Sequence, residues 1–165
     1  MKQSRSSKNS ILTSLGIHCE EWSHRPEWLE YAQLIWKGEG RVEELHDGSA
    51  QRRAFIDRAT RSFTERGVPT VRLRTWVNVM PPDDRDGYDK GYPHVHADET
   101  AITLVHYLQV PEGAGELDIF HEDQKYSIAP TAGTTIYIPN GVLHGVTRNR
   151  GKKNRVAFIA TAYPL

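Results

Sequence analysis

The sequence contains a single cysteine, Cys19, so the chain cannot form an intramolecular disulfide bond or a zinc site built from several thiolates. It has no apolar run near the roughly 20 residues that cross a bilayer, which argues against a membrane span. Its first ten residues are polar and the apolar stretch behind them is short, so we expect no secretory signal and a cytoplasmic location. The 21 basic and 21 acidic residues give a formal net charge of zero, which argues against strong binding to a nucleic-acid backbone.

The length and composition are those of one globular domain. The chain has 165 residues, of which 38% are hydrophobic and 25% are charged, enough to bury a core of ordinary size. Residues 1–10 are rich in Ser, Lys and Arg and predict a flexible tail. Residues 11–165 then form a single domain, with a helical N-terminal part over 11–67 and a barrel core over 68–165.

The spacing of apolar residues changes from helical to strand-like at Pro69. A first helix is expected from Pro26, which suits a first helical turn, and a second over 49–66, which Ser49 could cap. After Pro69 the chain alternates in short β-branched segments separated by Gly and Pro turns, which indicates a barrel or sandwich rather than βαβ units. The expected fold is mainly β, with N-terminal helices packed against an antiparallel double-sheet barrel. The predicted strands cover residues 71–80, 100–110, 115–121, 125–128, 133–139 and 155–162.

Four side chains that can bind a metal ion lie within six residues, namely His94, His96, Asp98 and Glu99. In an extended chain the period of two places His94, His96 and Asp98 on one face. A histidine and a carboxylate two residues apart can both reach one ion. The best candidate for a third ligand is His144, which follows a predicted strand and a Pro-Asn-Gly turn. His96, Asp98 and His144 would then form a two-histidine, one-carboxylate triad, which leaves coordination positions open and is typical of non-haem Fe(II) oxygenases.

An arginine near the third histidine supports this interpretation. Arg155 lies eleven residues after His144, at the start of the last predicted strand. Strand alternation puts Arg155 on one face with Ala157 and Ile159. An arginine inside a small barrel is costly to bury unless an anion pairs with it, and its planar fork matches a carboxylate. The sequence therefore predicts a carboxylate-binding role for Arg155.

These residues resemble the His-x-Asp, His and Arg pattern of the 2-oxoglutarate- and Fe(II)-dependent dioxygenases, which include prolyl hydroxylases and AlkB-type demethylases. The resemblance covers roughly residues 70–162 and is carried by HADE, by HGV followed after eight intervening residues by Arg155, and by WVNVM and IYIPNGVLHGV. It implies a double-stranded β-helix, also called a jelly roll, with a cupin-like barrel. It also implies His96, Asp98 and His144 as iron ligands, and Arg155 as the partner of the distal carboxylate of 2-oxoglutarate.

The same resemblance implies further cosubstrate contacts and an activity. Asn78 is a candidate contact on the strand before the ligand segment, and Tyr107 and Thr103 could supply hydroxyl groups. Two positions depart from the family pattern: Ala157 replaces a Ser or Thr, and Met80 replaces an aromatic residue. The implied enzyme is a hydroxylase that uses Fe(II), 2-oxoglutarate and O2 and releases succinate and CO2. Its expected substrate is an amino acid, a peptide side chain or a small metabolite.

A second resemblance, to the cupins, leaves two alternatives open. The segment from Gly133 to His144 matches the second cupin motif, G-x5-P-x-G-x2-H, and HVH with Glu99 resembles the first. In that case His94, His96, Glu99 and His144 bind the metal of an enzyme that does not use 2-oxoglutarate. The cupin pattern expects Asn four residues after His144, where this chain has Arg148. The spacing of Asp98 and the position of Arg155 favour the oxygenase, and a ligand-binding barrel without catalysis is the remaining alternative.

Overall fold

A computed structural model describes residues 5–36, 48–69, 72–82, 93–95 and 102–163. None of the helices in this part of the chain is long and apolar enough to cross a membrane. The helices are α1 (Arg5–Ser14), α2 (Pro26–Ile35) and α3 (Ala50–Glu65). The strands are β1 (His18–Glu21), β2 (Arg72–Met80), β3 (Ile102–Gln109), β4 (Leu117–His121), β5 (Gln124–Ile128), β6 (Thr134–Pro139), β7 (His144–Val146) and β8 (Arg155–Tyr163).

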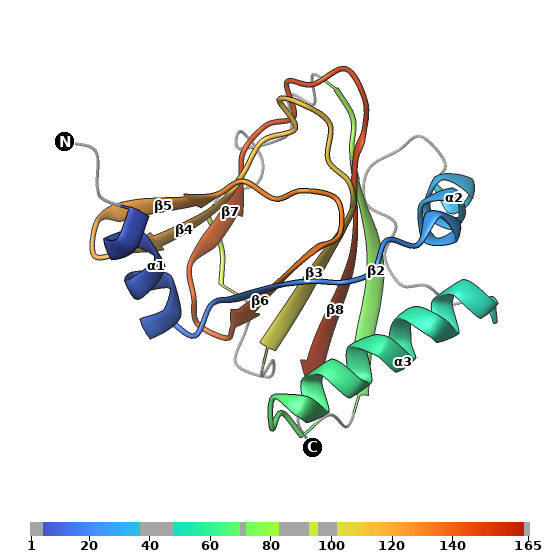
Figure 1. Ribbon diagram of the computed structural model, residues 1–165, viewed down its shortest axis with the longest axis horizontal. Helices are drawn as coiled ribbons and strands as arrows, with labels where there is room; N and C mark the ends of the chain where they lie inside the picture. The colour runs from blue at the N-terminus through green and yellow to red at the C-terminus, as the bar shows by residue number, and fades with distance from the viewer. Residues whose placement is uncertain (1–4, 37–47, 70–71, 83–92, 96–101, 164–165) are drawn as a thin grey trace.

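The strands form two antiparallel sheets that pack face to face (Figure 1). The larger sheet has the order β1-β6-β3-β8-β2 and the smaller one the order β5-β4-β7. Helices α2 and α3 lie on the outer side of the larger sheet, and α1 lies beside the smaller one (Figure 1). This arrangement confirms the predicted mainly β fold with N-terminal helices and a double-sheet barrel.

Helices α2 and α3 begin where the sequence predicts. Pro26 occupies the first turn of α2, where its missing N–H would have no intrahelical partner. The hydroxyl of Ser49 accepts a hydrogen bond of 3.1 Å from the backbone N–H of Arg52 and so caps α3. The apolar stripe of α3, which includes Phe55 and Phe63, is fully buried against the larger sheet.

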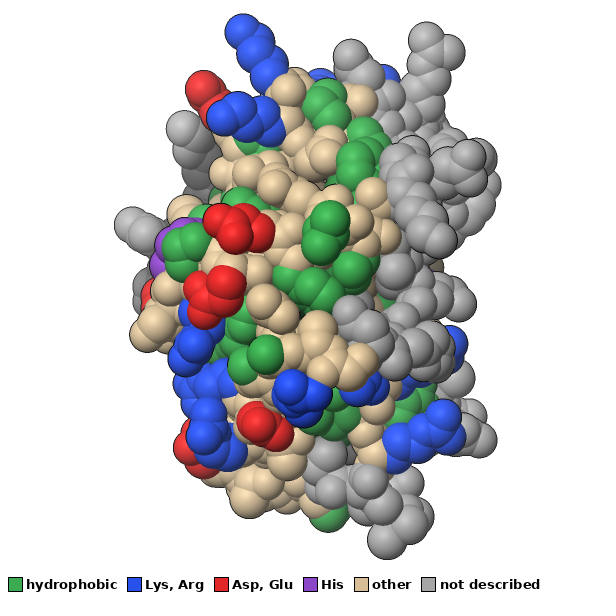
Figure 2. All heavy atoms as spheres, turned by 90° about the vertical axis from the view of Figure 1, so that its right-hand side faces the viewer, with side chains coloured by type: hydrophobic (Ala, Val, Ile, Leu, Met, Phe, Trp, Pro, Cys, Tyr) green, Lys and Arg blue, Asp and Glu red, His purple; other side chains and the backbone are tan. Residues whose placement is uncertain are grey.

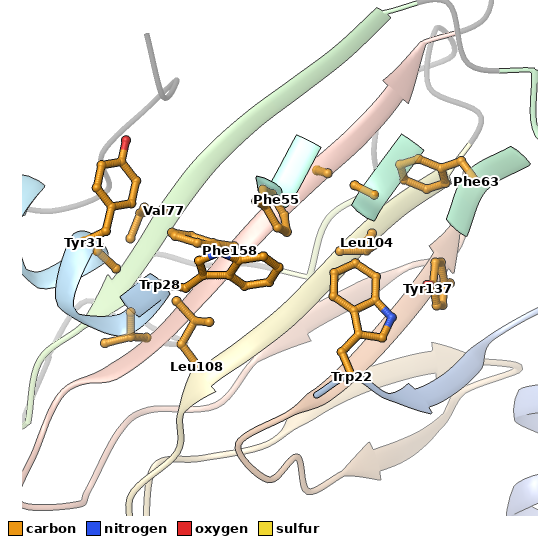
Figure 3. Packing of buried hydrophobic residues seen from close by; sticks show 14 of the residues in the cluster. Trp22, Trp28, Tyr31, Phe55, Phe63, Val77, Leu104, Leu108, Tyr137 and Phe158 are labelled. Atoms are coloured by element: carbon orange, nitrogen blue, oxygen red, sulfur yellow. The ribbon is translucent and has the colours of Figure 1, made fainter. Parts of the chain in front are cut away.

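An aromatic cluster joins the two helices to the outer face of the larger sheet (Figure 3). The ring of Trp28 on α2 lies 5.7 Å from that of Phe55 on α3 and 5.9 Å from that of Phe158 on β8. Burial of such rings dominates the stability of a core. On the other side of the helices, cationic, anionic and apolar side chains are interspersed (Figure 2), as expected for a face that meets water.

His106 is a buried polar residue in this cluster that the sequence analysis did not single out. Its side chain lies on β3, stacks on Trp22 with a ring separation of 4.8 Å, and has Nδ1 2.9 Å from the hydroxyl of Thr135. Burial, with the nearby charges of Arg58 and His24, lowers the pKa of His106 to about 4. The imidazole is therefore neutral in the folded protein at pH 7.

The low pKa of His106 predicts a loss of stability in mild acid. Between pH 6.5, the ordinary pKa of histidine, and about pH 4, the unfolded chain binds the proton and the folded chain does not. The free energy of unfolding should therefore fall as pH falls through this window, by about 3 kcal/mol in total for this residue. Urea denaturation from pH 7 to pH 4.5 measures the slope, and His106→Phe should make it shallower. The matched variant of a more exposed histidine, His121→Phe, should leave it unchanged; equal slopes for all three proteins would contradict the assignment.

A second cluster fills the space between the two sheets and includes helix α1. Leu12 and Ile17, just before β1, are buried there with Leu117 and Ile136. Helix α1 begins at Arg5, within the segment expected to be a tail, and the flexibility of residues 1–10 stays a prediction. Leu12 of α1 and Ile17, which follows the helix, are buried in this cluster and anchor a polar segment that has little to bury by itself. The assignment of residues 11–165 to a single domain stays a prediction.

Strand β1 was not predicted, because its sequence HCEE has no apolar alternation. It forms by pairing with β6 along four residues. The carboxylate of Glu20 accepts hydrogen bonds from the Tyr137 hydroxyl and the Trp22 indole. It also forms an ion pair of 2.9 Å with Arg66 at the end of α3, which fixes β1 to that helix. This edge of the larger sheet is therefore held by polar contacts between elements far apart in sequence.

Candidate functional site

A cavity of about 80 Å³ lies between the two sheets. The candidate metal ligand His144 lines it, and so do the candidate cosubstrate residues Asn78, Thr103, Tyr107 and Arg155. Five side chains from four different strands therefore meet in one place. That they bind a metal or a cosubstrate stays a prediction.

The register of the sheet explains why these side chains converge. On β8, Arg155 pairs with Met80 and Ala157 pairs with Asn78, both on β2. On the other side of β8, Ala157 pairs with Tyr107 of β3. Residues two apart on a strand share a face, and directly paired residues of neighbouring strands share it too. The alternation that places Phe158 against the helices therefore places Arg155 and Ala157 in the cavity.

Arg155 is the only cation that lines the cavity apart from the histidines, among the residues that the structure describes. Its side chain is 4% exposed, and two of its nitrogens donate to neutral acceptors. Nη1 lies 3.0 Å from the carbonyl oxygen of Ala114, and Nη2 lies 3.0 Å from the thioether sulfur of Met80. A buried guanidinium is costly to desolvate, so an anionic ligand in this cavity would gain a strong partner.

Two hydroxyl groups also line the cavity. Burial raises the pKa of Tyr107, an effect that the charge of Arg155 partly offsets, so the phenol stays protonated at neutral pH and can donate a hydrogen bond. The hydroxyl of Thr103 lies 3.2 Å from that of Thr161 on β8. Asn78 is half-buried on the neighbouring strand. A buried cation with a protonated phenol beside it fits the carboxylate end of a 2-oxo acid.

His144 stands beside His94 on the smaller sheet. The two residues form an antiparallel bridge with backbone hydrogen bonds of 2.8 and 3.1 Å, and their ring centroids are 4.6 Å apart. Nδ1 of His144 lies 2.8 Å from the carbonyl oxygen of Val142, which favours a proton on Nδ1 and leaves the Nε2 lone pair for a metal. Burial lowers the pKa of His144, and the neutral form is the one that binds a metal.

The other candidate ligands, His96, Asp98 and Glu99, lie outside the described residues. Within the described residues, no group of three or more His, Cys, Asp or Glu side chains is placed to hold a metal ion. The structure therefore brings together one predicted ligand, His144, and one alternative ligand, His94. The imidazole pair and the buried cation suit Fe(II) and a 2-oxo acid in chemical type.

Trp76 and Met80 also belong to this site, and the sequence analysis did not assign them to it. Trp76 lines the cavity from β2, two residues before Asn78. Its indole nitrogen is buried and has no hydrogen-bond partner within the described part of the chain. A buried N–H without a partner costs about 1–3 kcal/mol, so an acceptor on a bound molecule would stabilise it. The available signal was the period of two, which puts Trp76, Asn78 and Met80 on one face.

No protein-family model and no curated protein matches the sequence. Solved structures do match. A prolyl-4-hydroxylase from Pseudomonas putida superposes with a TM-score of 0.65 at 15% identity, over 97% of this chain and 94% of that one. A prolyl hydroxylase from Trichoplax adhaerens, in complex with a peptide fragment of a hypoxia-inducible factor, gives 0.68 at 14% identity, over 96% and 89% of the chains.

A third match is the non-haem α-ketoglutarate-dependent epimerase SnoN from nogalamycin biosynthesis, with a TM-score of 0.70 at 14% identity, over 96% of this chain and 83% of that one. At such low identity these likenesses show the fold. The chain has the double-stranded β-helix of the 2-oxoglutarate- and Fe(II)-dependent oxygenases, and the predicted resemblance is confirmed at that level. The reactions of the matched enzymes differ from one another.

Proposed function

We propose that the protein is an Fe(II)- and 2-oxoglutarate-dependent oxygenase. The observation that carries the proposal is the burial of Arg155 in the same cavity as His144, which Asn78, Thr103 and Tyr107 also line. A structural barrel would gain stability from an apolar residue at the position of Arg155. A carboxylate of a diacid cosubstrate would pair with that cation, and the fold shared with known 2-oxoglutarate oxygenases supports the same conclusion.

In this proposal His96, Asp98 and His144 hold the iron, and Arg155 receives the distal carboxylate of 2-oxoglutarate. When bound, iron and 2-oxoglutarate activate O2 for oxidation of a substrate, with release of succinate and CO2. The residues of the protein orient the metal ligand and position the cosubstrate. The carbonyl oxygen of Val142 orients the His144 ring, and Arg155 fixes one end of the cosubstrate.

The remaining walls of the cavity are apolar. Leu117 and Val146 line it from the smaller sheet, and Ile138 and Ile159 line it from the larger one. Such walls exclude water and strengthen the attraction between the guanidinium and a carboxylate. We propose hydroxylation of an amino acid, a peptide side chain or a small metabolite. The prolyl hydroxylase bound to a peptide supports a peptide among these substrates.

A cupin-type metalloenzyme that does not use 2-oxoglutarate is the second candidate function. It is favoured by one observation, the contact between the imidazole rings of His94 and His144. In that enzyme His94, His96, Glu99 and His144 would bind the metal, and Arg155 would have no diacid to receive.

The test is to incubate the purified protein with 2-oxoglutarate, Fe(II), ascorbate and O2 and to follow succinate by proton NMR. We expect slow succinate formation that requires both Fe(II) and 2-oxoglutarate, even without an added substrate. Asp98→Ala should abolish it, and the adjacent Glu99→Ala should retain it. A metal-containing protein that forms no succinate, and that loses its metal in Glu99→Ala but not in Asp98→Ala, would instead support the cupin enzyme.

A further inference from the structure

We infer that Met80 is a positioning residue for Arg155, an inference that rests on the proposed function. Met80 ends β2 and Arg155 begins β8, and the two form the last cross-strand pair between these strands. The thioether sulfur accepts a hydrogen bond from Nη2 of Arg155 at 3.0 Å. The side chain that departs from the family pattern at this position therefore contacts the proposed cosubstrate-binding cation directly.

A second neutral acceptor holds the other nitrogen of the guanidinium. Nη1 donates to the carbonyl oxygen of Ala114, a buried residue in the segment between β3 and β4. Two acceptors from two different segments fix the plane of the guanidinium. Both are uncharged, and a thioether is a weak, polarisable acceptor, so neither of them competes with a carboxylate for the charge of the guanidinium. An acidic side chain at position 80 would instead pair with Arg155 and compete with the cosubstrate.

The position of Met80 is itself fixed by a buried amide. Asn149 is fully buried, and its Nδ2 donates to the carbonyl oxygens of Met80 at 2.8 Å and Lys153 at 2.9 Å. The segment that carries Asn149 is tied to the segment that carries Ala114, since the N–H of Arg150 donates to the carbonyl oxygen of Gly113 at 2.7 Å. The sulfur and the Ala114 carbonyl oxygen therefore lie in one hydrogen-bonded framework around the guanidinium.

The contact can be observed without turnover. The chain has two methionines, Met1 and Met80, so labelling with [methyl-13C]methionine gives a simple spectrum in which Met80→Leu assigns the Met80 signal. We expect the Met80 methyl resonance to shift in Arg155→Lys and again when 2-oxoglutarate is added to the wild-type protein loaded with diamagnetic Zn(II). A resonance that moves in neither case would overturn the inference, whether or not any variant at position 80 folds.

Affinity provides the second readout, measured by calorimetric titration of 2-oxoglutarate into the Mn(II)-loaded protein. Met80→Leu keeps the volume and removes the acceptor, and it should raise the dissociation constant about threefold to tenfold. Met80→Glu introduces a competing carboxylate and should raise it about a hundredfold. The control is Leu108→Met, the reverse exchange on the helix-facing side of the same sheet, which should leave the dissociation constant unchanged.

If Met80 positions Arg155, its replacement should weaken binding only of ligands that carry the distal carboxylate. An analogue without that carboxylate therefore distinguishes positioning from a general structural effect. For 2-oxopentanoate, which lacks that carboxylate, all three variants should bind within twofold of the wild type. Equal losses for both 2-oxo acids would overturn the inference and mark Met80 as a packing residue. A wild-type protein that binds no 2-oxoglutarate would instead refute the proposed function, so the two failures are distinguishable.

Discussion

Replacing His144 by alanine is expected to lower succinate formation by more than about a hundredfold, because changes to groups that only orient a metal ligand already cost 10- to 100-fold. His144 is the one proposed ligand in the described part of the chain, and its ring is 4% exposed in the wall of the cavity. Loss of the Nε2 donor should also lower the metal content of the protein, measured by mass spectrometry after anaerobic reconstitution with Fe(II).

The fold should survive this substitution. The bridge between His144 and His94 consists of backbone hydrogen bonds, which alanine retains. Circular dichroism and the thermal midpoint test this point, so that a loss of metal is not mistaken for unfolding. Full activity in a folded His144→Ala protein would remove the basis of the proposed metal site.

Two other histidines complete the experiment. His121 lies at the end of β4 and is more exposed than His144, so His121→Ala should retain both metal and activity. His94→Ala separates the two candidate functions. In the oxygenase the adjacent ring is not a ligand and most activity should remain, whereas in the cupin enzyme its loss should release the metal.

Much of the fold could be predicted because local chemistry and tertiary structure agree in these segments. Pro26 and Ser49 start helices that the apolar stripes continue, and both helices lie where expected. Strand β2 alternates in sequence, and β3 and β8, which are buried on both faces, are short apolar and β-branched segments. Where the chain forms structure through distant partners, prediction failed: β1 depends on pairing with β6, and α1 depends on the burial of Leu12 and Ile17.

The same distinction applies to the site. Arg155 was found because a charge in an apolar alternating strand is unusual, and Asn78, Tyr107 and Thr103 followed from a family resemblance. Met80 was noted as a departure from the family pattern, and the period of two puts it on the same face as Asn78; the cross-strand register is what reveals its contact with the guanidinium. His106 was missed for a related reason, because its partner Thr135 belongs to a strand far away in sequence. The roles of His96, Asp98 and Glu99 stay predictions, as these residues lie outside the described part of the chain.

Replacing Arg155 by leucine is expected to raise the KM for 2-oxoglutarate about a hundredfold to ten-thousandfold, because two charge-assisted hydrogen bonds of about 1.5–3 kcal/mol each are lost. Arg155→Lys keeps the charge but not the planar fork, and its KM should lie between those of Arg155→Leu and the wild type. Iron binding should be nearly unchanged in both variants, since the guanidinium is not a ligand. Steady-state succinate formation at saturating Fe(II) measures these effects. Arg150→Leu, at an exposed arginine in the same segment, is the matched control and should retain the wild-type KM.

Stability should respond to Arg155→Leu in the opposite direction to function. The guanidinium is 4% exposed, and the desolvation of a buried cation weighs against folding when no cosubstrate is bound. Leucine removes that cost, and the free energy of unfolding from urea titration should stay the same or rise. Addition of 2-oxoglutarate to the Mn(II)-loaded wild type should raise its thermal midpoint, whereas the leucine variant should not respond at the same concentration. A variant that unfolds more readily, and that keeps the wild-type KM, would identify Arg155 as a structural residue with no part in binding a diacid.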